Sequence, residues 1–225
     1  MIIPLRPHQI FQLIKTQTGT ERLVQLSLPT QRTPIVLESM VLIALVKFFQ
    51  PRVYFEIGTY LGYEILNIAV NTSDTTKLFT LDFDKTSFQK ANQIPHDREL
   101  TLAHFDNETN LAFMNSVYEK KITQLFGDST QFDFTPFEQK VDFIYIDGGH
   151  DYHTVKSDTH NALKMLTQKD PGCITWHDFA NPPLPDVKKF LEEFAQTHTL
   201  YHVEKTFLCF YLHHPSDDWI QMLNA

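Results

Sequence analysis

The stretch Val53-Tyr54-Phe55-Glu56-Ile57-Gly58-Thr59-Tyr60-Leu61-Gly62-Tyr63 decides the fold of this chain. It begins with β-branched and aromatic residues, reaches an acid, passes two glycines and continues with helical spacing. This pattern is typical of a buried strand that turns sharply into a helix. Glycine lets backbone amides approach a ligand closely, and the helix that follows begins with unpaired N–H groups. The stretch therefore predicts a site for a nucleotide-like cofactor in an α/β fold.

Strand and helix patterns alternate through the rest of the chain. Strands are expected at 53–56, 77–82, 122–126, 141–146 and 173–176, and two closing strands at 201–203 and 206–212. This order predicts a Rossmann-like, seven-stranded, mostly parallel sheet with helices on both faces. The two closing strands have no helix between them, so they should pair antiparallel.

Residues 1–50 are expected to form a helical extension, with one helix over 8–15 and a buried helix over 35–49 that begins at Thr33-Pro34. This extension would serve as a lid over an acceptor pocket or as a dimer contact, and the sequence leaves both roles, and homo-oligomerisation, open. Residues 51–225 would form the cofactor-binding domain, within one unit overall.

Composition narrows the class of partner. The chain has 225 residues and a net charge of −8, without a basic stripe, so a small-molecule acceptor is favoured over nucleic acid. Cys173 and Cys209 lie in apolar runs, which suits buried reduced thiols in the cytoplasm. No leader pattern is expected at the N-terminus, and no run approaches the roughly 18 apolar residues of a membrane span.

Polar residues follow the last apolar residue of each predicted strand. They include Glu56, Asp82, Asp128, Asp147 and Asp178. The carboxyl ends of parallel strands meet at one edge of the sheet, where ligands bind. We therefore expect these side chains to converge on one site.

The glycine stretch departs from the dinucleotide fingerprint. Glu56-x-Gly58-x-x-x-Gly62 lacks the middle glycine that admits a pyrophosphate. Asp82, at the end of the next strand, could accept two ribose hydroxyls, and Asp128 could lie at an adenine edge. Alternatively, the glycines only permit a turn, Asp82 is a solvated strand end and Asp128 is an ordinary turn residue.

A second group of polar residues lies in Asp147-Gly148-Gly149-His150 and in His177-Asp178. Asp147 and Asp178 offer the oxygen ligands that Mg²⁺ prefers, and His150 is placed to take a proton from a substrate hydroxyl. His177 could be a second base, a ligand or a structural partner. Asp147 could instead stabilise its own loop by binding nearby amides.

Several other classes are disfavoured. The two cysteines have no C-x-x-C spacing, which argues against a zinc site. The chain lacks the G-x-S-x-G elbow of α/β-hydrolases and the G-x-x-x-x-G-K-[ST] loop of P-loop nucleotidases.

In the order of these motifs the chain resembles class I S-adenosylmethionine-dependent methyltransferases. The matching residues are 55–62, Leu81-Asp82, Gly127-Asp128-Ser129, 141–150 and 172–178. The last two segments resemble a subgroup that includes macrolide-sugar O-methyltransferases and cephalosporin-hydroxylase-like proteins, and catechol O-methyltransferase is more distantly similar.

The resemblance implies roles for the matching residues. The cofactor would be held by Glu56, Gly58, Thr59, Tyr60, Gly62, Asp82, Asp128, Ser129 and Asp147. Asp147 and Asp178 would bind Mg²⁺, and His150 would be the catalytic base beside Asp147. The catechol-type pattern has an asparagine directly after the second aspartate, where this chain has Phe179.

These features predict O-methylation of a small-molecule hydroxyl by S-adenosyl-L-methionine, with assistance from Mg²⁺. Two alternatives stay open: a cephalosporin-hydroxylase-like enzyme on the same scaffold, and a non-catalytic module that keeps the cofactor pocket.

Overall fold

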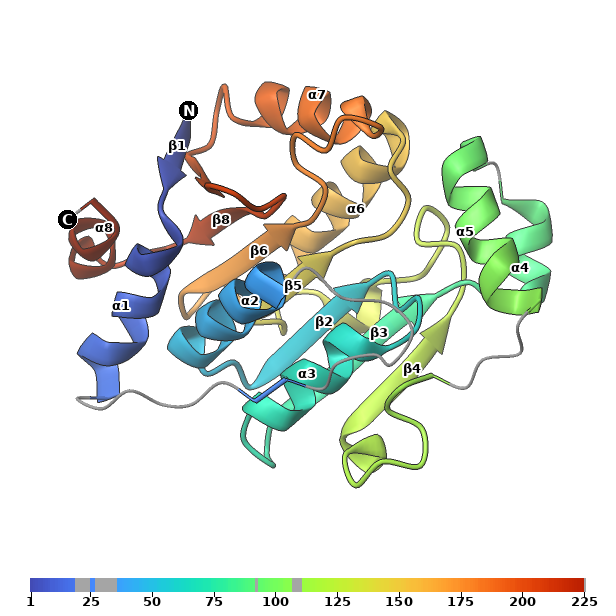
Figure 1. Cartoon of the computed structure of the whole chain (residues 1–225), viewed down its shortest axis with the longest axis horizontal. Helices are drawn as coiled ribbons and strands as arrows, with labels where there is room; N and C mark the ends of the chain where they lie inside the picture. The colour runs from blue at the N-terminus through green and yellow to red at the C-terminus, as the bar shows by residue number, and fades with distance from the viewer. Residues whose placement is uncertain (19–24, 27–35, 92, 107–110, 225) are drawn as a thin grey trace.

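A computed structural model describes residues 1–18, 25–26, 36–91, 93–106 and 111–224. Its centre is one mixed sheet with strand order β1-β7-β8-β6-β5-β2-β3-β4. The sheet and the helices on both its faces confirm the predicted fold class (Figure 1).

The central strands are parallel and their carboxyl ends are level. They are β2 (Val53–Ile57), β3 (Lys77–Asp82), β4 (Ile122–Phe126), β5 (Phe143–Ile146) and β6 (Gly172–Trp176). Ile57 pairs with both Leu81 and Ile146, and Ile146 pairs with Trp176. All residues of β5 and β6 are buried, as expected for strands covered on both faces. The loops after these strands therefore emerge side by side.

The sheet has eight strands, one more than the sequence predicted. The closing strands β7 (Leu200–Val203) and β8 (Cys209–His213) pair antiparallel, as expected. The additional strand is β1 (Ile2–Leu5), which pairs parallel with β7 at the edge of the sheet. Four residues that include Pro4 give little strand signal, and proline is tolerated there because an edge strand need not donate on both sides.

Helices cover the two faces of the sheet (Figure 1). α2 (Val36–Phe49) and α3 (Tyr63–Asn71) share one hydrophobic core, while α6 (Tyr152–Met165) and α7 (Pro185–Phe194) share the other. α1 (Pro7–Thr18) packs against α2 and against α8 (Asp217–Asn224). α4 (Lys85–Lys90) and α5 (Pro95–Asp106) follow β3 at the carboxyl edge. Two short 3₁₀ turns complete the elements, at Glu119–Lys121 and Thr135–Phe137.

The expected N-terminal extension is built into the core over much of its length. Nine residues of α2 are buried, and α2 contacts α3 and β6. The predicted loops at 18–20 and 29–31 and the helix start at Thr33-Pro34 fall largely outside the described residues. The role of 1–50 as a lid or dimer contact stays a prediction.

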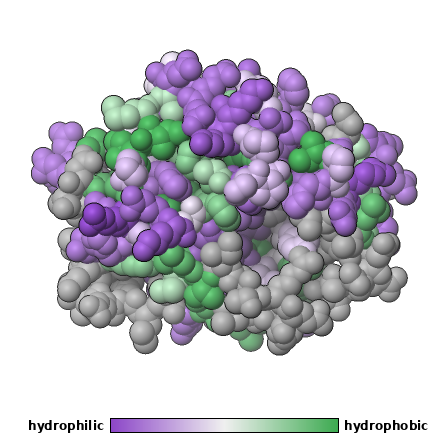
Figure 2. Space-filling view, turned by 45° about the horizontal axis from the view of Figure 1, so that its top comes forward, coloured by the Kyte–Doolittle hydropathy of each residue, from purple (hydrophilic) through white to green (hydrophobic). Residues whose placement is uncertain are grey.

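Two further expectations concern the surface and the thiols. Among the described helices, none has the length and apolar character of a membrane span. The face in Figure 2 shows hydrophobic residues in small groups among hydrophilic ones. Cys173 and Cys209 are free and buried, as predicted.

Candidate active site

A cavity of about 320 Å³ lies at the carboxyl ends of β2 to β6. Residues from the glycine loop, from α5 and from the loops after β5 and β6 form its wall. Those that carry polar side chains or the critical glycine are Gly58, Tyr60, Asp82, Gln93, His96, Asp97, Thr101, Ser129, Asp147, His150, His177, Asp178 and Asn181. Members of both predicted groups of polar residues therefore face one cavity.

Gly58 is required because two loops touch at this residue. It has φ +99°, and a Cβ built on it would lie 2.0 Å from the carbonyl oxygen of Asp147. The Asp147 amide also donates to the carbonyl of Ile57 over 2.8 Å. Only glycine permits this approach, which brings the cofactor loop against the acid that follows β5.

Asp82 lines the cavity and also fastens the glycine loop. Its Oδ2 accepts the amides of Thr59 at 3.0 Å and Tyr60 at 2.7 Å, and its Oδ1 accepts the amide of Phe83 at 2.7 Å. Tyr60 has φ +46°, in the left-handed region, so these bonds help to hold a strained turn. Asp82 is thus more than a solvated strand end.

Three residues that were predicted to hold the cofactor, Glu56, Thr59 and Gly62, instead pack behind the cavity. The Glu56 side chain is buried and its Oε1 accepts from Thr80, while Thr59 shares a 2.7 Å hydrogen bond with the same hydroxyl. Burial raises the pKa of Glu56 well above its usual range. Gly62 (φ +74°) lies at the start of α3, and a Cβ there would meet the Phe113 ring at 2.9 Å. These three residues shape the loop from behind the cavity wall.

Asp128 and Ser129, the two predicted cofactor residues after β4, have different surroundings. Asp128 Oδ1 accepts from the amide and the hydroxyl of Thr130, which is the geometry of an ordinary turn aspartate. Ser129 lines the cavity. Behind it lies Asp158 of α6, which is fully buried. Among the described residues its two carboxylate oxygens have no hydrogen-bond partner of ordinary geometry, although Ser129 faces them.

Asp147, His150 and Asp178 form the second half of the site. Each offers a ligand atom within 4.8 Å of those of the other two. His150 Nε2 lies 2.8 Å from Asp178 Oδ2, and its Nδ1 lies 2.7 Å from Asp97 Oδ1. The backbone at Asp178 has φ +59°, an uncommon value for a residue with a side chain that is often found at functional sites.

His177 extends this cluster toward α2. Its Nε2 lies 2.9 Å from Glu38 Oε2, and its Nδ1 lies 3.0 Å from Asp178 Oδ2 and 3.3 Å from Asp147 Oδ1. Glu38 also accepts the amide of Phe207. His177 and Asp147 border a second cavity of about 180 Å³ under α2 and α3, which includes Glu64.

The charges in the cluster shift one another's pKa. Burial alone would lower the pKa of His150, but hydrogen bonds to Asp178 and Asp97 raise it to about 10. Burial would likewise lower the pKa of His177, and the neighbouring acids, Asp147 first, raise it well above its usual range. Burial would raise the pKa of Asp178, but hydrogen bonds from His150 and His177 hold this pKa well below the usual range. The neighbouring acids therefore favour the protonated form of both rings.

Two acids of the cluster were not predicted from the sequence. Asp97 follows Pro95 in the first turn of α5, where an acid is commonly explained by the helix dipole alone. Glu38 did carry a signal, because it is a lone acid in the apolar segment of α2 and a buried charge requires a partner. Nothing in the sequence shows that each acid binds a histidine more than 50 residues away.

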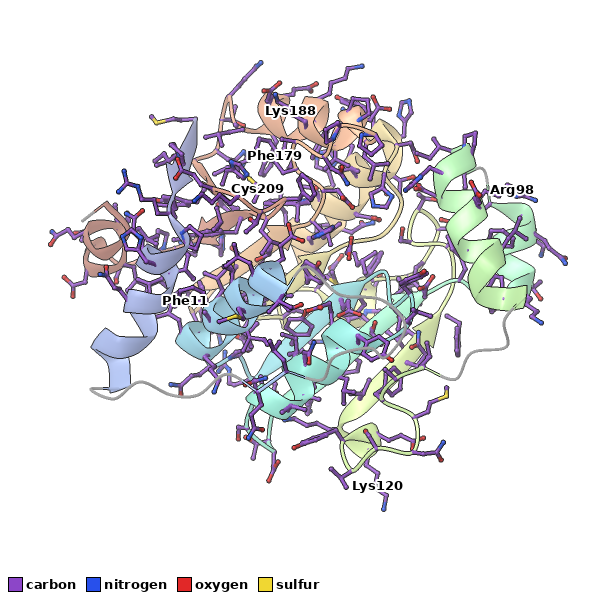
Figure 3. All side chains as sticks on the ribbon, in the orientation of Figure 1. Phe11, Arg98, Lys120, Phe179, Lys188 and Cys209 are labelled. Atoms are coloured by element: carbon purple, nitrogen blue, oxygen red, sulfur yellow. The ribbon has the colours of Figure 1, made fainter. Side chains whose placement is uncertain are left out.

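The residue directly after Asp178 is Phe179, and its surroundings are those of a core residue. Phe179 is buried, its amide donates to Phe207, and its ring packs beside His202 on the α7 side of the sheet (Figure 3). It supplies no ligand. Asn181 lines the cavity and donates to Asp178 Oδ1 at 2.5 Å. The donors present are two carboxylates and imidazole nitrogens, which fit a divalent cation without the asparagine of the catechol-type pattern.

The site can be compared with known proteins. A family model described as a methyltransferase domain matches residues 55–179, which is more than half of the chain and includes the carboxyl ends of β2 to β6. The chain belongs to this family. The methyltransferase identification from the sequence is confirmed, while the comparison with curated proteins finds no sequence match.

Solved structures of the same fold include O-methyltransferases. The methyltransferase PaMTH1 from Podospora anserina, bound to SAH, is 14% identical with a TM-score of 0.59, over 93% of this chain and 88% of that chain. The O-methyltransferase TomG from Streptomyces achromogenes, in complex with SAM, is 14% identical with a TM-score of 0.53, over 92% and 87%. An O-methyltransferase from Bacillus cereus, in complex with SAH, is 16% identical with a TM-score of 0.51, over 92% and 88%. At these identities the likeness supports the fold.

Proposed function

We propose that this chain transfers the methyl group of S-adenosyl-L-methionine to a hydroxyl oxygen of a small molecule. The observation that carries the proposal is the single cavity that joins Gly58, Asp82 and Ser129 to the acid and imidazole cluster. The methyltransferase family match supports the donor, and the fold neighbours solved with SAM or SAH support the same cofactor.

The cofactor would bind along the first half of the cavity. Asp82, at the end of β3, lies where a carboxylate can accept a ribose hydroxyl, and Ser129 lies where it can reach the adenine. Gly58 and Asp147 line the cavity side by side, where the methionine portion would lie. The net negative charge of the cluster favours the positive sulfonium.

The reaction is an in-line displacement. The sulfur–methyl bond breaks, sulfur keeps the electron pair, and the hydroxyl oxygen forms a bond to the methyl carbon and loses its proton. Since the sulfonium is already activated, the protein mainly supplies orientation and a proton acceptor. A divalent cation held by Asp147 and Asp178 would lower the pKa of a hydroxyl bound to it.

The sequence-based hypothesis gives the role of proton acceptor to His150. The raised pKa of His150 makes it protonated at neutral pH, so we propose Asp147 for this role. The Asp147 side chain is 29% exposed, compared with 13% for His150 and 8% for Asp178, so it is the acid of this group most open to an acceptor.

The acceptor itself is proposed as a small molecule in the cytoplasm. The acidic net charge of −8 disfavours a nucleic-acid backbone. Burial raises the pKa of the Cys173 thiol to about 12, and buried free thiols suit a reducing compartment.

Mass spectrometry of the purified protein under native conditions tests the donor, and calorimetry with SAM and SAH tests its affinity. We expect binding of both, and transfer of a labelled methyl group to at least one member of a panel of small hydroxyl compounds. The variant Asp82→Asn should weaken cofactor binding by about tenfold or more through a lost charged acceptor. A chain that binds neither SAM nor SAH would contradict the proposal.

A further inference from the structure

One buried amide oxygen in the cavity wall has no partner. Gln93 lines the cavity, and its Oε1 is buried without a hydrogen bond to any of the described residues. The other buried polar atoms of this wall that lack a hydrogen bond, His150 Nε2 and His177 Nδ1, each lie beside a carboxylate. A buried acceptor without a donor costs free energy, so Gln93 Oε1 points to a ligand that donates a hydrogen bond to it.

The backbone on both sides of Gln93 is held in place. The Ala91 amide closes the last turn of α4. Ile94 packs against the hydrophobic core that α6 and α7 share, and α5 begins directly after it. In the first turn of α5, the Asp97 carboxylate accepts the backbone amide of His150 at 2.8 Å. Gln93 therefore extends into the cavity from a fixed segment, which suits a side chain that selects a ligand.

The segment that carries Gln93 begins at the proposed ribose site. Asp82 ends β3 and Phe83 follows it, and both line the same cavity as Gln93. The base of the cofactor is bonded directly to its ribose, so a ribose at Asp82 brings adenine toward the residues that follow β3. Phe83 adds an aromatic surface on which a base can stack.

The acid that the sequence places at the adenine edge is already used in its own turn. Asp128 Oδ1 accepts from the amide of Thr130 at 2.9 Å and from its hydroxyl at 2.7 Å. Ser129 remains on that side of the cavity. The exocyclic amine of adenine has two N–H groups that point in different directions, so Ser129 can meet one of them and leaves the other for a second acceptor.

The side-chain amide of glutamine matches one edge of adenine. Its oxygen accepts from the exocyclic amine and its nitrogen donates to the neighbouring ring nitrogen, as in the reading of adenine in DNA. An ionised carboxylate only accepts, and lysine and arginine only donate, so none of these matches both atoms of that edge.

We propose that Gln93 binds the adenine base of S-adenosyl-L-methionine through its side-chain amide and makes the site selective for adenine. The inference rests on the proposed function for the presence of this cofactor. Gln93 is then a specificity-determining residue on the connection between β3 and β4, outside the strand-end motifs that the sequence analysis assigned to the cofactor.

A ligand that lacks the exocyclic amine tests this contact. Calorimetry compares SAH with the same compound in which unsubstituted purine replaces adenine. The unmodified chain should bind SAH about 5- to 150-fold more tightly, which is the discrimination that one amide–adenine pair provides. In Gln93→Leu the ratio of the two affinities should fall by about fivefold or more, because leucine can neither accept from the amine nor donate to the ring.

Gln89→Leu is the matched control. Gln89 is exposed on α4 and is not among the described residues that line the cavity. This variant should keep the affinity of the unmodified chain for both ligands. Thermal denaturation without ligand checks that both variants are folded.

The outcomes separate this proposal from methyl transfer. Equal affinity of the unmodified chain for SAH and its purine analogue overturns the adenine contact, and this measurement needs no variant. A ratio that is the same in Gln93→Leu and in the unmodified chain also overturns the contact, while the binding of SAH still supports the methyltransferase proposal. Binding of neither ligand by the unmodified chain overturns the methyltransferase proposal and the adenine contact with it.

Discussion

Because Gly58 has no side chain, the loops after two strands can meet at one site. The glycine loop after β2 and the acid after β5 meet through backbone atoms, because the position of a Cβ is already occupied by the Asp147 carbonyl. The sequence identified Gly58 as a turn or a ligand contact. The structure adds close contact between two loops, which no pattern within one segment could reveal.

Gly58→Ala should therefore disrupt both stability and cofactor binding. The methyl group would meet backbone atoms, 2.0 Å from the Asp147 carbonyl oxygen, in a left-handed conformation. We expect a loss of roughly 3 kcal/mol or more in urea unfolding. Gly148→Ala is the matched control, since the nearest atom to its Cβ would be in the Ile57 side chain, at 3.2 Å, and it should cost distinctly less. Equal costs for the two variants would refute the argument.

The buried acid Asp158 should make the stability of the folded chain depend on pH. Burial raises its pKa to about 7 from an ordinary value of 3.8, so the folded state favours the protonated acid. Its contribution to stability is fully present below about pH 4 and is lost as the pH rises through about 7. Asp158→Asn should thus gain stability over the unmodified chain between pH 4 and 8, by up to about 4 kcal/mol.

Unfolding midpoints measured across this pH range check the prediction. The exposed substitution Asp74→Asn serves as control and should leave the pH profile unchanged. A constant difference between Asp158→Asn and the unmodified chain at all pH values would show that Asp158 does not titrate in this range.

At the scale of elements, α2 joins the core of the fold to the active site. Apolar patterns in the sequence predicted α2 and the seven strands from β2 to β8, because each has a periodic or continuous run of apolar residues. They missed β1, whose four residues are too few to show a period. The acids Glu38 and Asp97 lie on helices that are far from their histidine partners in the sequence. Only the folded arrangement brings them to the site, so these partners could not be predicted.

The variant Glu38→Gln should weaken the connection between α2 and the active site. The carboxylate binds both the His177 ring and the Phe207 amide, and the amide side chain would lose a charged hydrogen bond at a buried position. We expect a loss of about 1–3 kcal/mol in the free energy of unfolding. Glu204→Gln, at an exposed position, should change stability by no more than about 0.5 kcal/mol. No loss from Glu38→Gln would show that His177 is held by other contacts.

At the scale of the whole molecule, the cofactor site unites segments from both halves of the chain. Its wall includes residues of β2, β3, α5 and the loops after β4, β5 and β6. The ordered motifs predicted that these segments would meet at one edge. They did not predict which residues face the cavity and which, like Glu56, lie in the core behind it, since both groups are polar residues at strand ends.

Because so many segments meet there, SAM should stabilise the entire fold. At a SAM concentration of 100 times Kd, the free energy of unfolding should rise by about 2.7 kcal/mol. Thermal denaturation at increasing SAM concentration measures this as a rising Tm. The Asp82→Asn variant should need higher SAM for the same shift, whereas a Tm independent of SAM would speak against binding to the folded chain.

The two free cysteines provide a reporter of sheet opening. Cys173 on β6 and Cys209 on β8 are both buried, and burial raises the pKa of Cys173 to about 12 and holds that of Cys209 far above the ordinary value. A thiol-specific alkylating reagent should leave the native chain unlabelled and add two labels after unfolding. The rate of labelling without denaturant would then report how often the sheet beside the active site opens, and how far SAM or a metal ion slows that opening.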